Sequence, residues 1–147
     1  MPEVMRLVAD IGGTNARFAL VAEHSLRPEH EKTVRCEDYA SLEQAVRSYL
    51  QERGNPTVVE AALDVATNVT GDRVHLTNGP WGFSIEQTRR ALDFERLRVV
   101  NDFTALALAV PTLAPDELVK IGGGTALPAT PIAVIGPGTG LGVSGLI

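Results

Sequence analysis

The chain has 147 residues, of which 44% are hydrophobic and 21% are charged, an ordinary balance for a globular protein with its own core. Its formal net charge of −5 argues against nucleic acid or an anionic membrane as the main partner, because both favour clustered lysine and arginine. The single cysteine, Cys36, excludes an intrachain disulfide, and with no export signal evident the expected location is the cytoplasm. The longest apolar run, residues 105–110, is too short to cross a membrane.

Hydrophobic periodicity predicts strands and helices along the first two thirds of the chain. In chain order they are strands at residues 5–11, 17–23 and 32–36, a helix at 41–53, strands at 58–66 and 73–77, a helix at 84–92, a strand at 97–100 and a helix at 103–110. The last helix is apolar nearly all round, so we expect it to be buried. This order predicts an α/β fold with a mixed sheet covered by helices on both faces.

The first two helices carry clear start signals. Ser41 with Gln44 forms a capping box, and Gly54 follows the end of the first helix. Ser84 with Gln87 opens the second helix.

Composition changes at residues 113–131, where prolines and three consecutive glycines indicate a connector. Beyond it, an apolar run, a glycine-rich turn and a second apolar run repeat the pattern of the opening hairpin. We therefore expect a first domain at residues 1–112, a connector at 113–131, and at 132–147 the opening hairpin of a second, incomplete domain.

The turn Gly12-Gly13-Thr14-Asn15 follows the first predicted strand and favours phosphate binding. Its glycines bring backbone N–H groups close to an anion with no Cβ in the way, and Thr14 and Asn15 add side-chain donors. A tight hairpin is the plainer explanation for two glycines. Asp10 favours the phosphate interpretation, because a carboxylate in a buried strand is costly unless hydrated Mg²⁺ or Arg17 pairs with it.

A second turn, Gly138-Thr139-Gly140, lies within the run Gly136-Pro-Gly-Thr-Gly-Leu-Gly142 and has the same character. The P-loop pattern is missing from the sequence, and the spacing of a dinucleotide-binding Gly-x-Gly-x-x-Gly fails here.

Asn101-Asp102 ends a predicted strand and precedes the third helix. Helix capping is the plain explanation for such a pair. Between two phosphate loops, however, Asp102 is placed to accept the proton of an attacking hydroxyl while Asn101 orients the same molecule. The combination indicates phosphoryl transfer to a hydroxyl.

Five ordered motifs together resemble bacterial glucokinases over essentially the whole chain. They are Asp10-Ile-Gly-Gly-Thr-Asn-Ala-Arg-Phe, Thr70-Gly-Asp-Arg-Val-His-Leu-Thr-Asn78, Trp81-Gly-Phe-Ser84, Asn101-Asp-Phe-Thr-Ala105 and Gly136-Pro-Gly-Thr-Gly-Leu-Gly142. That family belongs to the actin-like, hexokinase-like ATPases. The resemblance implies a ribonuclease-H-like domain with a mixed five-stranded sheet, and ATP-dependent phosphorylation of the glucose 6-hydroxyl.

By position in these motifs, the resemblance implies that Asp102 is the general base and that Asn101 and Asp102 bind the sugar. It implies ATP and Mg²⁺ as cofactors, with the metal held by Asp10 through water. The implied nucleotide-binding residues are Ala9, Asp10, Ile11, Gly12, Gly13, Thr14 and Asn15 in the first loop and Gly138, Thr139 and Gly140 in the second. We expect Trp81 to belong to the core rather than to a sugar platform.

The sequence departs from the family pattern at Asn68, where similar proteins carry proline in a loop near the sugar. The family's Glu-x-Gly-His motif, a further sugar-binding glutamate and its adenosine-binding segment come after the point that corresponds to residue 147. We therefore expect an N-terminal portion of a glucokinase with little or no activity alone. We expect its hairpin at 132–147 to pair with a second copy, as a homodimer or by other self-association.

Two other classes of protein remain open at this point. One is a non-catalytic sugar- or nucleotide-sensing module of the same fold, although no helix-turn-helix is visible. The other is an actin-like or chaperone-type ATPase, against which Asn101-Asp102 before an apolar helix favours a sugar kinase.

Overall fold

The computed structural model describes residues 4–137 and 141–147 and divides the chain into two compact units, Met1–Asn101 and Asp102–Ile147. The predicted first domain ran to residue 112 and so included the third predicted helix. Contacts instead group that helix with the residues that follow it. The second unit therefore joins the third predicted helix, the predicted connector and the hairpin.

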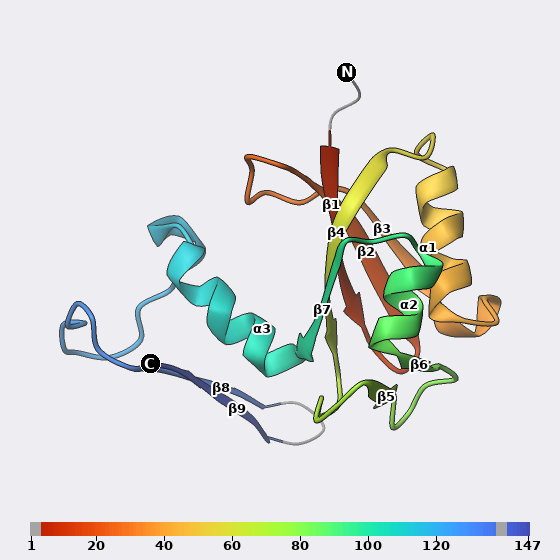
Figure 1. The fold of residues 1–147 in the computed structure, drawn as a ribbon. Helices are drawn as coiled ribbons and strands as arrows, with labels where there is room; N and C mark the ends of the chain where they lie inside the picture. The colour runs from red at the N-terminus through yellow and green to blue at the C-terminus, as the bar shows by residue number, and fades with distance from the viewer. Residues whose placement is uncertain (1–3, 138–140) are drawn as a thin grey trace. The chain divides into compact units, whose positions relative to one another are not determined.

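A five-stranded mixed sheet forms the centre of the first unit (Figure 1). Its strands are β1 (Val4–Ile11), β2 (Asn15–Ala22), β3 (Glu29–Arg35), β4 (Thr57–Val65) and β7 (Arg96–Asn101), in the order β3-β2-β1-β4-β7. The first three strands pair antiparallel, whereas β4 runs parallel to β1 and β7 parallel to β4. The predicted mixed sheet is confirmed, and β3 lies at its edge.

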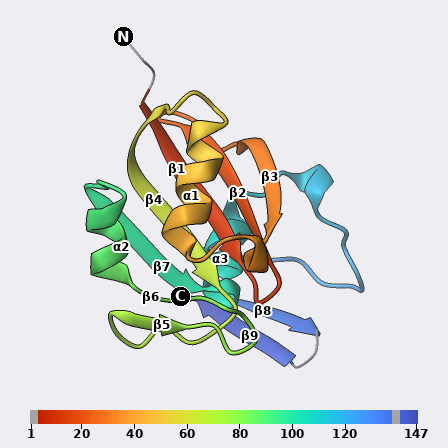
Figure 2. The ribbon, with the colours of Figure 1, turned by 90° about the vertical axis from the view of Figure 1, so that its right-hand side faces the viewer.

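Both helices of the first unit, α1 (Leu42–Gln51) and α2 (Ile85–Ala91), lie on one face of the sheet (Figures 1 and 2). The sequence predicted helices on both faces, and the two helices of this unit share one face. The reason is topological: the chain crosses from β1 to β4 and from β4 to β7 in the same direction, and right-handed crossovers then place both helices on the same side.

The hydrophobic core lies between the sheet and α1. Alternate residues of β1, including Leu7 and Ile11, point into it and are completely buried. Phe18 of β2 packs against Tyr49 of α1, with ring centroids 5.4 Å apart. Burial of these large side chains, worth about 1.5–3 kcal/mol each, holds β1 and the loop that follows it in place.

The serine caps of both helices are confirmed, whereas the Gln44 side chain accepts a hydrogen bond from the Ala40 amide instead of closing a capping box on Ser41. The Ser41 hydroxyl accepts a hydrogen bond from the Gln44 amide at 3.2 Å, and the Ser84 hydroxyl accepts one from the Gln87 amide at 3.1 Å. After α1, Gly54 has φ +76°, a conformation that other residues adopt only with strain.

A small antiparallel ribbon, β5 (Arg73–His75) with β6 (Gly82–Ser84), precedes α2. The strand predicted at residues 73–77 corresponds to β5, whereas no strand was predicted at residues 82–84, which form β6. Between them, Trp81 is 3% exposed and its indole N–H donates to the Tyr39 carbonyl at 3.0 Å. Trp81 is therefore a core residue, as expected.

The second unit contains α3 (Asp102–Ala109), the 3₁₀ turns Val110–Thr112 and Pro115–Glu117, and the hairpin of β8 (Ile132–Pro137) and β9 (Leu141–Leu146). The expectation that α3 is buried is wrong here, because only Ala107 of its residues is buried and Leu106 and Leu108 are about half exposed. A helix apolar on every side needs neighbours on every side, and α3 contacts mainly the hairpin.

Among the described residues, none of the helices has the length and apolar content needed to cross a membrane.

One carboxylate fixes the start of α2. The Ser84 hydroxyl donates to Asp72 Oδ2 at 2.5 Å, and the Glu86 amide donates to Asp72 Oδ1 at 2.9 Å. The bond from Ser84, followed by that from the Glu86 amide, lowers the pKa of Asp72 below its ordinary value. Asp72 is thus a cap supplied from outside the helix, in addition to Ser84 itself.

We predict that Asp72→Asn lowers the melting temperature of the chain at pH 7, and that this difference shrinks as the pH falls. The folded-state pKa is depressed, so the stabilisation is fully present above the unfolded-state pKa of about 3.9 and is lost as pH drops through the folded value. Thermal unfolding between pH 7 and pH 2.5 measures it, with Asp116→Asn in the connector as control. A difference between the Asp72 variant and the wild type that is independent of pH would contradict this assignment.

Candidate functional site

The three parallel strands of the sheet end in one row. Ile11 of β1 is in register with Val65 of β4, and Val65 is in register with Asn101 of β7. Because neighbouring strands lie about 4.8 Å apart, Ile11 and Asn101 are separated by roughly 10 Å. The loops that leave these strands therefore emerge along one edge, at the carboxyl ends where open α/β sheets bind their ligands.

The first glycine loop follows β1 and is a closed turn. The Gly12 amide donates to the Asn15 carbonyl at 2.9 Å, so this backbone donor is already used, contrary to the expectation of a loop with free donors. The Cys36 amide donates to the Thr14 carbonyl at 2.8 Å, and the Cys36 thiol lies 3.5 Å from the Gly12 carbonyl oxygen. Burial raises the pKa of this thiol, which suits a structural donor rather than a nucleophile. The side chains of Thr14 and Asn15 are exposed at the turn.

Asp10 is exposed, which corrects the expectation of a carboxylate in a buried strand. It lies on the sheet face opposite α1 and α2, since its neighbours Ala9 and Ile11 point into the core. In the register, Arg17 lies across from it on β2 and Asp64 lies beside it on β4. Sequence reasoning missed Asp64, because nothing in the sequence signals which residue of a distant strand falls beside Asp10.

The register places the carboxylates of Asp10 and Asp64 side by side on one sheet face, and carboxylates are among the ligands that Mg²⁺ uses. The described residues contain no group of three or more His, Cys, Asp or Glu that could enclose a metal. Mg²⁺ commonly uses only one or two carboxylates, together with water and substrate phosphates. Asp10 and Asp64 therefore suit a hydrated Mg²⁺ ion, which needs few protein ligands, better than a metal ion whose ligands all come from the protein.

Asn101 ends β7 and is tied to the neighbouring loop. Its side-chain amide donates to the Thr67 carbonyl at 3.2 Å, which places the end of β7 against the loop that contains Asn68. The departure from the family pattern at Asn68 thus lies next to the predicted sugar-binding amide.

Asp102 is the first residue of α3, and the Phe103 amide donates to its Oδ1 at 2.9 Å. The ring of Phe103 fits against two glycines of the hairpin, Gly136 and Gly142, which face each other across β8 and β9. A Cβ on Gly136 would come within 2.6 Å of Phe103 Cζ, and one on Gly142 would overlap the ring. These two glycines therefore serve the close approach of Phe103, a role that the sequence pattern did not reveal.

The remaining residues of the second loop, Gly138, Thr139 and Gly140, lie outside the described residues.

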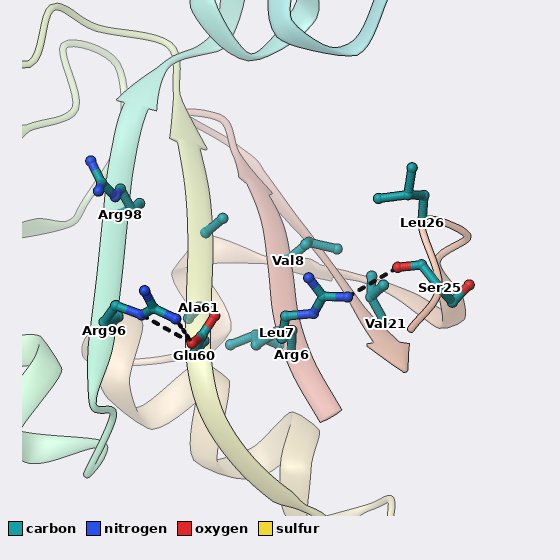
Figure 3. A pocket seen from close by; sticks show the side chains of 11 residues that line it. Arg6, Leu7, Val8, Val21, Ser25, Leu26, Glu60, Ala61, Arg96 and Arg98 are labelled. Carbon is teal, nitrogen blue, oxygen red and sulfur yellow. Dashed lines mark hydrogen bonds and ion pairs between the residues drawn. The ribbon is translucent and has the colours of Figure 1, made fainter. Parts of the chain in front are cut away.

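A hollow of about 360 Å³ lies on the sheet face that α1 and α2 leave uncovered (Figure 3). Its lining includes Arg6, Glu60, Arg96 and Arg98, and Arg96 is paired with Glu60. The residues belong to the middle and starting parts of the strands. None of the predicted site residues lines it, so this hollow is distinct from the row of strand ends.

Known proteins that are similar to this α/β chain include several glucokinases. It is 50% identical to a glucokinase of Marinobacter nauticus over 141 residues, which is 96% of this chain and 44% of that protein. It is 52% identical to a glucokinase of Aromatoleum aromaticum over 143 residues, which is 97% of this chain and 43% of that protein. A crystal structure of a glucokinase from an Antarctic psychrotroph superposes with a TM-score of 0.90 at 42% identity, covering 97% of this chain and 46% of that one.

The family model for glucokinase matches residues 7–147, and the chain belongs to the glucokinase family. The chain spans less than half the length of the curated relatives it matches. The family resemblance drawn from the five motifs is confirmed.

We predict that Gly142→Ala displaces the Phe103 ring in the 147-residue chain, because the added methyl group would occupy the position of the ring. Nuclear Overhauser contacts between the Phe103 ring and the α protons of Gly136 should be present in the wild type and lost in the variant. Gly145→Ala is the matched control on the same strand, since its Cβ would lie at an ordinary 3.8 Å from the Ile132 carbonyl oxygen. Retention of the ring contacts in Gly142→Ala would show that the glycine pair is not needed for this packing.

Proposed function

We infer that this chain supplies the first phosphate loop and the general base of an ATP-dependent glucokinase. The observation that carries the inference is the shared row of Ile11, Val65 and Asn101 in a chain of the glucokinase family. That row brings the loop after β1 and Asn101, the sugar-binding candidate at the end of β7, to the same edge of one sheet. The finer fold assignment, a ribonuclease-H-like domain of the actin-like ATPases, belongs to this proposal.

In this proposal the exposed side chains of Thr14 and Asn15, with the backbone amide of Gly13, hold the phosphates of ATP. Ala9, Asp10 and Ile11 are paired in the sheet on both sides and are proposed to support this loop at its start. The Gly12 amide closes the turn instead of binding the nucleotide. The residues Gly138, Thr139 and Gly140 are proposed to contact the same phosphates from the second loop. Rigid backbone donors of this kind bind an anion without reorganising when charge develops on it.

Asp10, with Asp64 beside it, is proposed to hold Mg²⁺ through water at the end of β1. When bound, the ion supplies positive charge that offsets the charge of the triphosphate. Arg17, directly across from Asp10, adds a fixed positive charge on the same face.

Asp102 and Asn101 are proposed to act on the sugar. Asn101 orients the glucose, and Asp102 accepts the proton of the 6-hydroxyl as its oxygen forms a bond to the γ-phosphorus of ATP. The bond from that phosphorus to the bridging oxygen breaks, and its electron pair leaves with ADP. The amide of Phe103, bound to Oδ1, keeps the carboxylate oriented while Oδ2 takes the proton.

The test is a hybrid kinase in which residues 4–147 of this chain replace the matching segment of the Marinobacter nauticus glucokinase, half of whose residues there are identical. A coupled assay with glucose and ATP should show turnover by the hybrid and little or none by the 147-residue chain alone. An inactive but folded hybrid would overturn the proposed function, and robust turnover by the chain alone would overturn the expectation that it needs the remaining segment.

In the hybrid kinase, we predict that Asp102→Asn lowers kcat by about 10²–10⁴-fold while the KM for glucose stays within a few fold. Asparagine keeps an oxygen for the Phe103 amide and so preserves the start of α3, but it cannot take up the proton. Steady-state kinetics measure the effect, with Asp116→Asn as control. Near-normal turnover would remove Asp102 from the mechanism.

We further propose that the 147-residue chain associates with a second copy through its hairpin. Ile135 and Val143 face each other across β8 and β9 and are both more than 60% exposed, and the hairpin pairs with no further strand among the described residues. Apolar, open-edged strands of this kind are templates for pairing with another chain.

We predict that light scattering coupled to size exclusion detects a dimer or larger species of the chain, and that Ile135→Lys with Val143→Lys converts it to a monomer. Leu127→Lys, a change at an equally exposed leucine of the connector, should leave the association intact. A monomeric wild type would contradict this proposal.

A further inference from the structure

The turn at residues 76–81 lies directly against the first glycine loop. A Cβ built on Gly13 would come within 2.5 Å of the Asn78 carbonyl oxygen, and one built on Gly79 would come within 3.0 Å of both Cα and the carbonyl oxygen of Gly13. Both obstacles are backbone atoms, which cannot rotate away as the end of a side chain can. The two segments therefore touch backbone to backbone, and glycine at 13 and at 79 is what permits the contact.

The turn is itself firmly held. The Leu76 amide donates to the Trp81 carbonyl at 3.3 Å, and the Gly79 amide donates to the Leu76 carbonyl at 3.3 Å. The indole of Trp81 is buried in the core and donates to the Tyr39 carbonyl at 3.0 Å. The position of Gly79 is thus set by a buried aromatic side chain two residues further along the chain.

A second contact holds the glycine loop through other atoms. The amide of Cys36 binds the Thr14 carbonyl, and its thiol lies within reach of the Gly12 carbonyl oxygen. The loop is consequently restrained at residues 12 and 14 by Cys36 and at residue 13 by the 76–81 turn. Neither restraint depends on a ligand.

We propose that the turn at residues 76–81 is a positioning element for the phosphate loop, with Gly79 as the positioning residue. This inference rests on the proposed function and gives a role to the motif that ends at Asn78 and to Trp81. The turn fixes the backbone of Gly13 before the nucleotide arrives, so less ordering is required on binding. A backbone shift of even 1 Å at a reacting group can lower the rate about 10²-fold, so the position of this turn matters for phosphoryl transfer.

The test compares Gly79→Ala with Gly71→Ala in the hybrid kinase defined above. The two glycines lie in the same motif region, but a Cβ on Gly71 meets nothing within 4 Å. In Gly79→Ala the KM for ATP should rise about tenfold or more while the KM for glucose stays within about twofold, and Gly71→Ala should match the parent. In the 147-residue chain, the amide resonances of residues 12–14 should move in Gly79→Ala and stay in place in Gly71→Ala.

The activity of the parent hybrid tests the proposed function, and the ATP kinetics of the Gly79→Ala variant test the positioning role of the turn. If the hybrid is active and Gly79→Ala leaves its KM for ATP unchanged, the positioning role of the turn is overturned and the proposed glucokinase function is kept. An equal rise in the KM values for ATP and for glucose also overturns the positioning role, because that pattern indicates general damage to the fold. An inactive parent hybrid overturns both.

A milder variant covers the case in which Gly79→Ala does not fold. Trp81→Phe keeps an aromatic ring in the core but removes the N–H that binds the Tyr39 carbonyl. A loosened turn should then raise the KM for ATP selectively, by a smaller factor than Gly79→Ala. A KM for ATP of Trp81→Phe equal to that of the parent hybrid would by itself overturn the proposal.

Discussion

The hydrogen-bond register of the three parallel strands is the constraint on which the candidate site depends. Because β1, β4 and β7 end at Ile11, Val65 and Asn101 in one row, the segments that follow them share one edge of the sheet. A slip of one residue in either pairing would turn the side chains of that strand to the other face. The buried alternate residues of β1 prevent such a slip, since it would bring Asp10 into the core. Core packing and site geometry therefore have the same cause.

Local patterns in the sequence predicted much of the fold. The opening hairpin, the serine-capped helices and the strand before Asn101 each depend on residues close together in the chain, and each is present in the structure. Errors arose where distant segments decide the outcome. The placement of α1 and α2 on one face follows from the direction of the crossovers, and the exposure of α3 follows from which segments cover it. Neither is encoded in a single helix.

The glycines illustrate the same limit at the candidate site. Gly13 was predicted to be a site of close approach to an anion, and Gly136 and Gly142 are the ends of the second glycine motif. All three allow close approach, but to Asn78 and Phe103 of the protein itself. The complementary residues were in view in the sequence as separate motifs. What the sequence did not show is that one motif packs on another, because the pairing crosses more than thirty residues in each case. Short glycine motifs thus record both ligand contacts and internal packing.

The wide spacing of the paired strands has a consequence for synthesis on the ribosome. Ile11 and Val65 are more than fifty residues apart, and Asn101 comes later still. Contacts between such remote segments carry a high loop-closure entropy and form late. A nascent polypeptide can complete its first hairpin early, but the shared edge exists only after residue 101 has left the exit tunnel. Until then the edge lacks β7, so the edge that carries the candidate site is completed only at the last step of sheet assembly.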